Sequence, residues 1–229
     1  MNVLAIDSSG TVASVAIMNA DDLVGEFTIH NKLTHSQTLL PMIDAVFSMS
    51  GLRIQDMDAV AVSAGPGSFT GLRIGAATAK GLCQAAGLPI IPVPTLEALA
   101  FHMSDTNSLV CPIMDARRNQ VYTGIYRFKD KKPHEILEQC AMSMDDLIEK
   151  INELGQSVIF VGDGIEVFKE IIQSKLTIDH SFADPEKRLQ RAANVASLAS
   201  RHEKIPAKEF APTYLRLSQA ERERMKNNQ

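Results

Sequence analysis

The spacing of hydrophobic residues changes several times along the chain, and these changes separate predicted strands from predicted helices. Short apolar runs are typical of buried strands, and they occur at residues 3–6, 12–18, 23–29, 59–62, 90–93, 109–114, 120–128, 136–142 and 158–161. Apolar residues spaced by three and four indicate helices at 35–50, 72–86, 95–103, 144–152, 165–174 and 189–202. Each half of the chain is therefore predicted to contain three strands, a helix, a strand and a helix.

A polar stretch at 104–108 separates the two halves and is the best candidate for a boundary between lobes. We place an N-terminal lobe at 1–105 and a C-terminal lobe at 106–229. The repeated order of elements predicts an α/β fold with two lobes, each of the βββαβα type. Beyond Arg216 the chain is strongly charged, and we expect this tail to be frayed.

A glycine-rich loop, Gly65-Pro66-Gly67-Ser68-Phe69-Thr70-Gly71, lies between a predicted strand and a predicted helix. Unpaired N–H groups and the helix dipole favour a bound phosphate at such a position. The loop lacks both the lysine of a P-loop and the dinucleotide spacing, so a tight turn or a protein contact stays the alternative. The hypothesis of a vestigial nucleotide or phosphate site involves Asp7, Ser8, Ser9, Gly65, Gly67, Gly71 and Asp115. Within it, Asp7 is predicted either to bridge to magnesium or to cap its own turn.

Composition narrows the class of protein. The 229 residues are 45% hydrophobic and 22% charged, which is ordinary for a globular chain. The net charge of -4 argues against a protein that holds nucleic acid by itself, because binding phosphates needs a basic surface. The three cysteines contain no C-x-x-C pair, and no apolar stretch reaches the roughly 18 residues of a membrane span. We therefore expect a cytoplasmic protein with neither disulfides nor a membrane segment.

Several motifs, in one order along nearly the whole chain, resemble the TsaB (YeaZ) family. They are Asp7-Ser8-Ser9, the stretch 35–43, the stretch 65–75, Asp115-Ala116-Arg117-Arg118 and Tyr214-Leu215-Arg216. The resemblance implies a two-lobed actin-like (ASKHA) fold and a role in making threonylcarbamoyladenosine next to the anticodon of tRNA. Members resemble scaffolds more than catalysts. They pair with TsaD, which transfers the threonylcarbamoyl group, with TsaE as a further ATPase partner, and with themselves when TsaD is missing.

The residues that matter for catalysis in related families differ in this chain. The H-x-E-x-H metal motif of the catalytic sister family corresponds to 95–99, where only Glu97 survives. Arg117 and Arg118 stand where kinases of the superfamily have a small-residue turn, and we expect their side chains to fill the space of a phosphate. We therefore expect a non-catalytic protein without metal or cofactor, with weak nucleotide binding left open.

The alternative is an ATP-dependent phosphotransferase of the actin-like sugar or acetate kinase class. It is suggested by Asp7, by the loop glycines Gly67 and Gly71, and by the turn Gly162-Asp163-Gly164. Turnover of ATP by the isolated protein, with and without small acceptors, would distinguish a kinase from a scaffold.

Two helices of the N-terminal lobe are predicted to carry a partner interface. The helix 35–50 is apolar on more than one face, since Met42 falls off its main stripe. In the next helix, Gly71, Gly75 and Ala79 lie four apart, a strip that contacts either its own sheet or a partner helix. The predicted interface comprises His35, Leu39, Met42, Ile43, Val46, Arg73, Gly75 and Ala79. We expect a homodimer that TsaD displaces at the same surface, and contact with tRNA only indirectly, through the complex.

Overall fold

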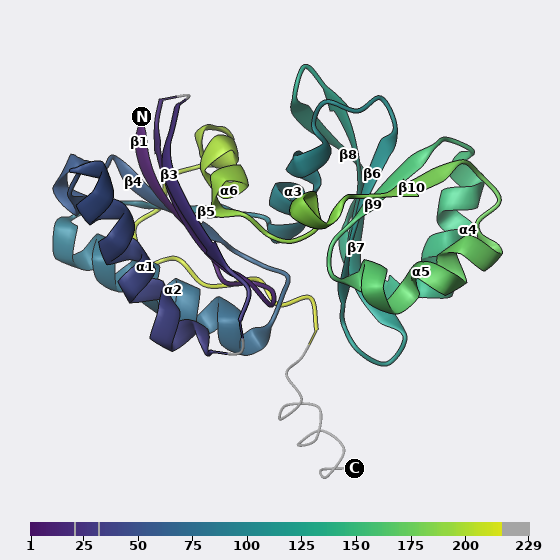
Figure 1. Ribbon diagram of the computed structural model, residues 1–229, viewed down its shortest axis with the longest axis horizontal. Coiled ribbons are helices and arrows are strands. Elements are labelled where there is room, and N and C mark those ends of the chain that lie inside the picture. The colour runs from purple at the N-terminus through teal and green to yellow at the C-terminus, as the bar shows by residue number, and fades with distance from the viewer. Residues whose placement is uncertain (21, 32, 217–229) are drawn as a thin grey trace, which may run out of the picture.

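The computed structural model describes residues 1–20, 22–31 and 33–216, which form two α/β lobes lying next to each other (Figure 1). The first half of the chain contains β1 (Asn2–Asp7), β2 (Ala13–Asn19), β3 (Asp22–Ile29), α1 (His35–Ser50), β4 (Ala59–Ser63), α2 (Phe69–Ala86), β5 (Ile90–Val93) and α3 (Thr95–Ala100). Its sheet has the order β3-β2-β1-β4-β5. The first three strands are antiparallel, and β4 and β5 run parallel to β1.

The second half repeats this arrangement. It contains β6 (Leu109–Asp115), β7 (Gln120–Lys129), β8 (Lys132–Ser143), α4 (Met144–Leu154), β9 (Val158–Val161), α5 (Gly164–Lys175), β10 (His180–Phe182) and α6 (Ala192–Leu198). Along the described part of the whole chain, four short 3-10 turns complete the elements: η1 (Ile54–Asp56), η2 (Phe101–Met103), η3 (Pro185–Lys187) and η4 (Ala199–Arg201). The second sheet, β10-β9-β6-β7-β8, has the topology of the first. The predicted two-lobed α/β fold of the actin-like type is therefore confirmed.

The structure differs from the predicted elements near β8 and near the C-terminus. β8 begins at Lys132, so the connection to β7 shrinks to Asp130 and Lys131, both with positive φ. The prediction at 136–142 found the second part of this strand but missed its polar start at 132–135, because an edge strand has little apolar surface to bury. The helix predicted at 189–202 is only α6 followed by η4, and the short strand β10 was not predicted. The tail predicted to be frayed lies outside the described residues.

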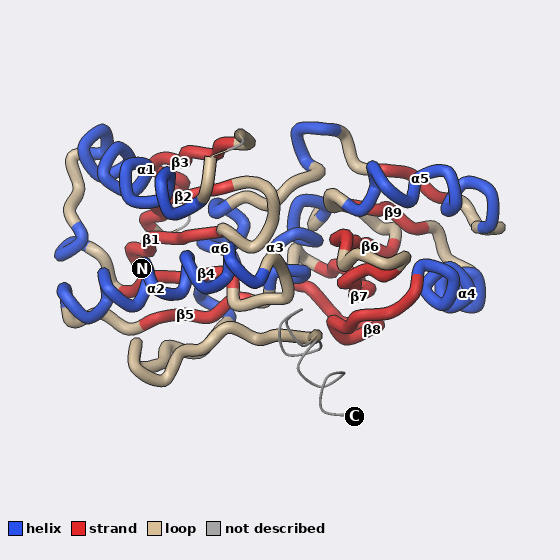
Figure 2. Tube along the Cα trace, turned by 90° about the horizontal axis from the view of Figure 1, so that it is seen from below, coloured by secondary structure: helices blue, strands red, loops and turns tan. Residues whose placement is uncertain are grey.

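Both faces of the first sheet are buried at its strands β1, β2, β4 and β5, because helices cover each face (Figure 2). Along β1, Leu4 and Ile6 face the core formed with α1 and α2, whereas Val3 and Ala5 face the core formed with α6. This alternation explains why β1 is a continuous apolar run in the sequence. Among the residues that the structure describes, no helix is both long enough and apolar enough to cross a membrane.

The last helix of each half packs against the sheet of the other half. Leu96 and Leu99 of α3 join Val110 of β6 and Tyr126 of β7 in one buried cluster of the second lobe. Conversely, α6 covers the first sheet. The predicted boundary at 105/106 is therefore wrong as a division of packing units, because a linear division cannot represent exchanged helices.

After α6 the chain continues along the first lobe. The backbones of Ile205 and Ile90 form two hydrogen bonds, and Phe210 is buried in the first core. The N–H of Thr213 donates to the carbonyl of Ala64 at 2.7 Å. This C-terminal segment therefore belongs to the first lobe, although the sequence places it in the second half.

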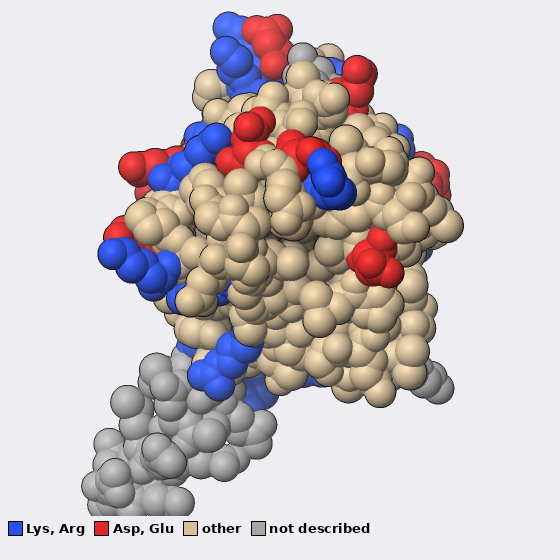
Figure 3. Space-filling model, turned by 90° about the vertical axis from the view of Figure 1, so that its left-hand side faces the viewer, with Lys and Arg blue, Asp and Glu red and all other residues tan. Residues whose placement is uncertain are grey.

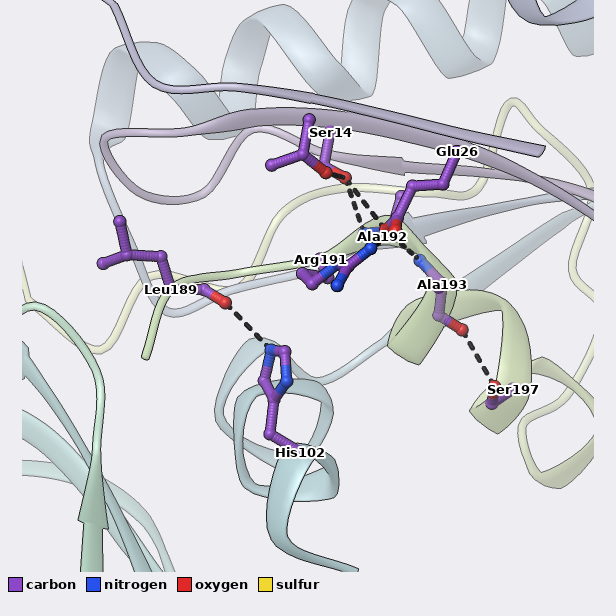
Figure 4. Close-up of polar contacts among 9 residues, drawn as sticks. Ser14, Glu26, His102, Leu189, Arg191, Ala192, Ala193 and Ser197 are labelled. Carbon is purple, nitrogen blue, oxygen red and sulfur yellow. Dashed lines mark hydrogen bonds and ion pairs between the residues drawn. The ribbon is translucent and has the colours of Figure 1, made fainter. Parts of the chain in front are cut away.

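Polar side chains of β2 and β3 hold the N-terminus of α6 (Figure 4). The Ser14 hydroxyl accepts a hydrogen bond from the N–H of Ala192 at 2.8 Å, and the Glu26 carboxylate accepts one from Ala193 at 3.0 Å. Arg191 forms an ion pair with the same carboxylate. These contacts satisfy N–H groups that a helix cannot pair internally, and a carboxylate there also complements the helix dipole.

Candidate functional site between the lobes

A cavity of about 390 Å³ lies where the two lobes meet. The first lobe contributes the turn after β1, including Ser9 and Thr11, and the loop before α2, including Gly67. From the second lobe come the end of β6, with Asp115, the turn after it, and Asp163, which directly precedes α5. Equivalent positions in the two repeats therefore form opposite walls, because in each sheet the first and fourth strands are parallel neighbours and end at the same edge.

Asp7 lies behind the wall of this cavity and not in it. One carboxylate oxygen accepts hydrogen bonds from the N–H of Ser9 at 2.9 Å and from its hydroxyl at 2.6 Å. The other oxygen is buried and has no hydrogen-bond partner among the described residues. Burial raises the pKa of Asp7, and the nearby hydroxyls of Ser63 and Ser9 oppose that rise. The carboxylate thus caps its own turn, as one of the two sequence-based alternatives predicts.

The loop glycines allow close contact between two backbone segments. A Cβ atom added at Gly67 would lie within 3.0 Å of the Ser9 carbonyl, and one at Gly71 would lie equally close to the Ser8 carbonyl. The N–H of Ser68 donates to the Ser9 carbonyl at 2.7 Å, and the N–H of Gly71 donates to the Ser68 hydroxyl at 3.3 Å. Two N–H groups of the loop are therefore already paired within the chain. The close approach of the two backbone segments is sufficient to explain the glycines, and no bound phosphate is needed to account for them.

On the opposite wall, two carboxylates and one guanidinium meet. The Asp115 carboxylate accepts from the N–H of Arg117 at 2.8 Å and pairs with its guanidinium at 3.3 Å. The Asp163 carboxylate accepts from the N–H of Asp115 at 3.3 Å. Burial raises the pKa of Asp163, and the Asp115 carboxylate adds to the rise, while hydrogen bonds from backbone N–H groups oppose it. The wall therefore carries charges of both signs and suits a polar ligand.

The arginine turn does not fill the cavity as predicted. The Arg117 side chain is 87% exposed at the rim, and Arg118 is exposed without lining the cavity. Arg117, Arg118 and Asn119 all have positive φ, so the turn bends outward and carries its side chains into solvent. The expectation that these two arginines occupy the space of a phosphate is therefore wrong.

The structure brings the predicted site residues together, but only some of them reach the cavity. Ser9, Gly67 and Asp115 line it, whereas Asp7, Ser8, Gly65 and Gly71 are buried beneath it. The lining also includes residues outside the predicted set: Thr11, Phe69, Tyr122, Asp163 and Arg216. The repeated element order could have identified Asp163, since its turn after β9 corresponds to the glycine loop after β4.

Most of the predicted interface residues lie inside the first lobe. Leu39, Met42, Ile43, Val46 and Ala79 are at most 4% exposed and belong to its core. Because the sheet already covers these side chains, assigning them to a partner is wrong.

The remaining three interface residues have contacts within the chain. The Nε2–H group of His35 donates to the Gly10 carbonyl at 3.0 Å. A Cβ atom added at Gly75 would lie within 3.0 Å of the Ser8 hydroxyl, so the strip of Gly71, Gly75 and Ala79 faces its own lobe. Arg73 is exposed, with its guanidinium 4.3 Å from the centre of the Phe69 ring.

Comparisons with known proteins agree with this two-lobed architecture. The TsaD family model, described as tRNA N6-adenosine threonylcarbamoyltransferase, matches residues 25–224. The tRNA threonylcarbamoyladenosine biosynthesis protein TsaB of Bacillus subtilis is 31% identical over 221 residues, covering 96% of each chain. TsaB of Haemophilus influenzae is 34% identical over 231 residues, covering 94% of each chain. The structure of YeaZ from Pseudomonas aeruginosa superposes with a TM-score of 0.77 at 25% identity, covering 93% of this chain and 99% of that one. The chain therefore belongs to the TsaB (YeaZ) family.

Proposed function

We propose that the chain acts in the biosynthesis of threonylcarbamoyladenosine in tRNA as a non-catalytic subunit. In this role it pairs with TsaD, which transfers the threonylcarbamoyl group from threonylcarbamoyl-AMP, and it works with TsaE. The involvement in this biosynthesis rests on one observation, the match to TsaB relatives along nearly the whole chain. The scaffold role is supported by the contacts of the candidate catalytic groups, and the partnership by the outward surface of α1 and α2.

The first support is that the candidate catalytic groups are already engaged within the chain. In the stretch where the catalytic sister family holds its metal, the Glu97 carboxylate lies 3.0 Å from Nε2 of His202. Within residues 1–20, 22–31 and 33–216, His, Cys, Asp and Glu side chains form no group of three that could hold a metal ion. The carboxylate of Asp115 is paired with Arg117. These groups therefore stabilise turns and lobe contacts, which suits a scaffold.

The second support is the outward face of α2. Ala77, Gly81 and Ala85 lie four apart and are exposed, on the opposite side from the buried strip at Gly71, Gly75 and Ala79. A Cβ atom at Gly81 would meet no heavy atom of the described chain within 4 Å. Glycine inside a helix costs about 1 kcal/mol relative to alanine, and no contact within the described chain requires it here. A second helix approaching closely would require such small side chains.

The composition of this surface also favours a protein partner. α1 and α2 lie next to each other, and their only charged residues are Asp44, Arg73 and Lys80. Leu40 and Met49 on α1 are 57% and 79% exposed. Figure 3 shows this end of the first lobe as a broad surface of mostly uncharged residues. Low charge and exposed apolar side chains are typical of protein interfaces. We propose that self-pairing and TsaD use this one surface, so that TsaD displaces the second copy.

The surface is tested with Gly81→Leu, which adds bulk without a clash inside the chain. We expect the monomer of this variant to melt at or a few degrees above the temperature of the parent chain, because helix propensity is gained, and to lose at least tenfold in affinity both for a second copy and for TsaD. Gln173→Leu, at an exposed position on α5, is the matched control and should pair normally. If Gly81→Leu binds TsaD as the parent chain does, the surface is assigned wrongly. If only one of the two pairings is lost, the shared surface is refuted.

The scaffold role is tested by reconstitution with TsaD, TsaE, tRNA and threonylcarbamoyl-AMP. Product should form only when the chain is present, and Gly81→Leu should reduce it in proportion to the TsaD bound. The second candidate function, an ATP-dependent phosphotransferase, is favoured by the carboxylates Asp115 and Asp163 in the interlobe cavity. Hydrolysis of ATP by the isolated chain that rises with a small acceptor would establish that alternative instead.

Contact with tRNA is proposed to be indirect, because a net charge of -4 provides few phosphate contacts. We expect weak binding of tRNA by the isolated chain, lost as salt rises from 50 to roughly 200 mM. Tight binding that resists salt would show instead that the chain itself holds the RNA.

A further inference from the structure

A second cavity, of about 420 Å³, shares no lining residue with the interlobe site. Its wall contains Pro94, which precedes α3, Glu97 of α3 and Tyr126 of β7. His134 and Glu135 from β8, and His202, which follows η4, complete its polar lining. Segments far apart in the sequence thus bring two carboxylates and a phenol to one cavity, a set that the sequence motifs do not indicate.

The phenol of Tyr126 is a buried polar group without a partner. The residue is 0% exposed, and its hydroxyl has no hydrogen-bond partner among the described residues. Burial, and then the carboxylates of Glu135 and Glu97, raise the pKa of Tyr126, so the hydroxyl stays protonated. A buried hydroxyl without a partner destabilises the fold, and a ligand in the cavity that accepts or donates a hydrogen bond there removes this cost.

The two carboxylates lack a full complement of positive charge. Glu97 is 8% exposed, and within the described chain its ion-pair partner is His202 alone. Glu135 forms no ion pair with any described residue. Burial, and then the Glu97 and Glu138 carboxylates, raise the pKa of Glu135. When both lining histidines, His134 and His202, are neutral, the cavity therefore holds two negative groups that repel each other.

We propose that this cavity binds the primary ammonium group of a small aliphatic amine, held by Glu97 and Glu135 and by the hydroxyl oxygen of Tyr126. An ammonium group has three donors and no acceptor, which matches two carboxylates and a phenol oxygen. An ammonium group contacts its acceptors at hydrogen-bond distances, which are longer than the distances between a metal ion and its ligands. A metal ion fits less well, because the described residues include no group of three His, Cys, Asp or Glu side chains that could hold one. Pro94 and Pro133 provide apolar walls for the attached methylene chain.

Two nearby basic residues, Lys132 and Arg201, do not line the cavity that contains the phenol. They line an adjoining cavity of about 550 Å³, which shares Glu97, Pro133, His134 and His202 with the cavity of Tyr126 but does not include Tyr126 itself. Arg201 donates to the carbonyl of Lys131 at 3.1 Å. The amine is therefore expected to enter with its ammonium end toward Tyr126 and Glu97, and not toward the basic rim.

The experiment is calorimetric titration of the full chain with putrescine at pH 8.5, where histidines are ordinarily uncharged. The uncharged analogue 1,4-butanediol tests whether the ammonium is needed. Glu97→Gln should weaken putrescine at least tenfold, because a hydrogen bond to a charged group is lost. Glu149→Gln, an exposed carboxylate on α4, is the matched control and should bind as the parent chain does.

Tyr126→Phe gives a second, independent outcome. Without ligand its melting temperature should equal or exceed that of the parent, because an unpaired hydroxyl is removed. The increase in melting temperature caused by putrescine should nevertheless shrink. The proposal is overturned if the parent chain does not bind putrescine, if butanediol binds equally well, if magnesium displaces putrescine at equal concentration, or if Glu149→Gln weakens binding as much as Glu97→Gln.

Discussion

The two glycines inside α2 make a sharp test of how this helix packs. At Gly75, a Cβ atom would lie within 3.0 Å of the Ser8 hydroxyl, which is buried and donates to the Gly71 carbonyl at 2.9 Å. At Gly81, a Cβ atom would meet nothing within 4 Å in the described chain. Substitution by alanine gains about 1 kcal/mol of helix propensity at both positions. The same change should therefore have opposite effects on stability.

The magnitudes follow from these surroundings. Overpacking typically costs about 1–3 kcal/mol, so after the gain in helix propensity Gly75→Ala should lose up to about 2 kcal/mol. Gly81→Ala should gain about 1 kcal/mol. For a chain of this size, 1 kcal/mol corresponds to roughly 2–4 °C in melting temperature. Both variants are compared by circular dichroism at concentrations low enough to keep the chain monomeric.

A double-mutant cycle with Ser8→Ala identifies the cause. Ser8→Ala alone should cost about 1 kcal/mol for the lost hydrogen bond to Gly71. It leaves only the Ser8 Cβ, at 3.7 Å from a Cβ at Gly75, which is ordinary contact. In this background Gly75→Ala should become stabilising, a coupling of about 1–3 kcal/mol. If Gly75→Ala stabilises the parent chain, or destabilises it equally without the Ser8 hydroxyl, the packing argument is refuted.

Three further predictions concern buried polar groups. The folded-state pKa of Asp7 is raised above its ordinary value of 3.8, so ionisation of Asp7 destabilises the native state increasingly as the pH rises from 3.8 and fully above the folded-state pKa. Asp7→Asn should therefore stabilise the chain at pH 7, and in an acid denaturation series this gain should shrink below the folded-state pKa and vanish near pH 3.8. Burial lowers the pKa of His102 to about 4, so its stabilising effect is complete above about 6.5 and is lost as the pH falls toward 4. Urea unfolding at pH 7.5 and 4.5 should show a smaller acid loss for His102→Gln than for the parent, and an equal loss would contradict the assignment. Glu26→Ala should cost about 1–3 kcal/mol because it leaves the N–H of Ala193 unpaired, while Glu26→Gln keeps an acceptor and should lose less.

The sequence by itself determined the order of elements and the family. Alternation and apolar runs identified β1 to β9, although only the second part of β8, because their side chains must match a buried sheet. The motifs at Asp7, 65–75 and Asp115 marked the positions that the fold brings together between the lobes. These motifs follow strands at equivalent positions of the duplicated topology. In each half, the turns after the first and fourth strands lie at the same edge of the sheet.

Only the tertiary structure decided which sheet each helix covers. The exchange of α3 and α6 between the sheets is invisible locally, because each helix has an apolar face that either sheet could bury. The short strand β10 forms because β9 provides its hydrogen-bond partners, and not through its own pattern.

The orientation of α2 shows the same limit. Its sequence contains two strips of small residues, one including Gly75 and the other including Gly81, and helical periodicity places both on well-defined sides. Nothing in the spacing says which strip faces inward. The Ser8 turn decides it, because that turn approaches the helix so closely at Gly75 that no larger side chain fits. The strip around Gly81 is thereby left facing outward, where it remains accessible to a partner.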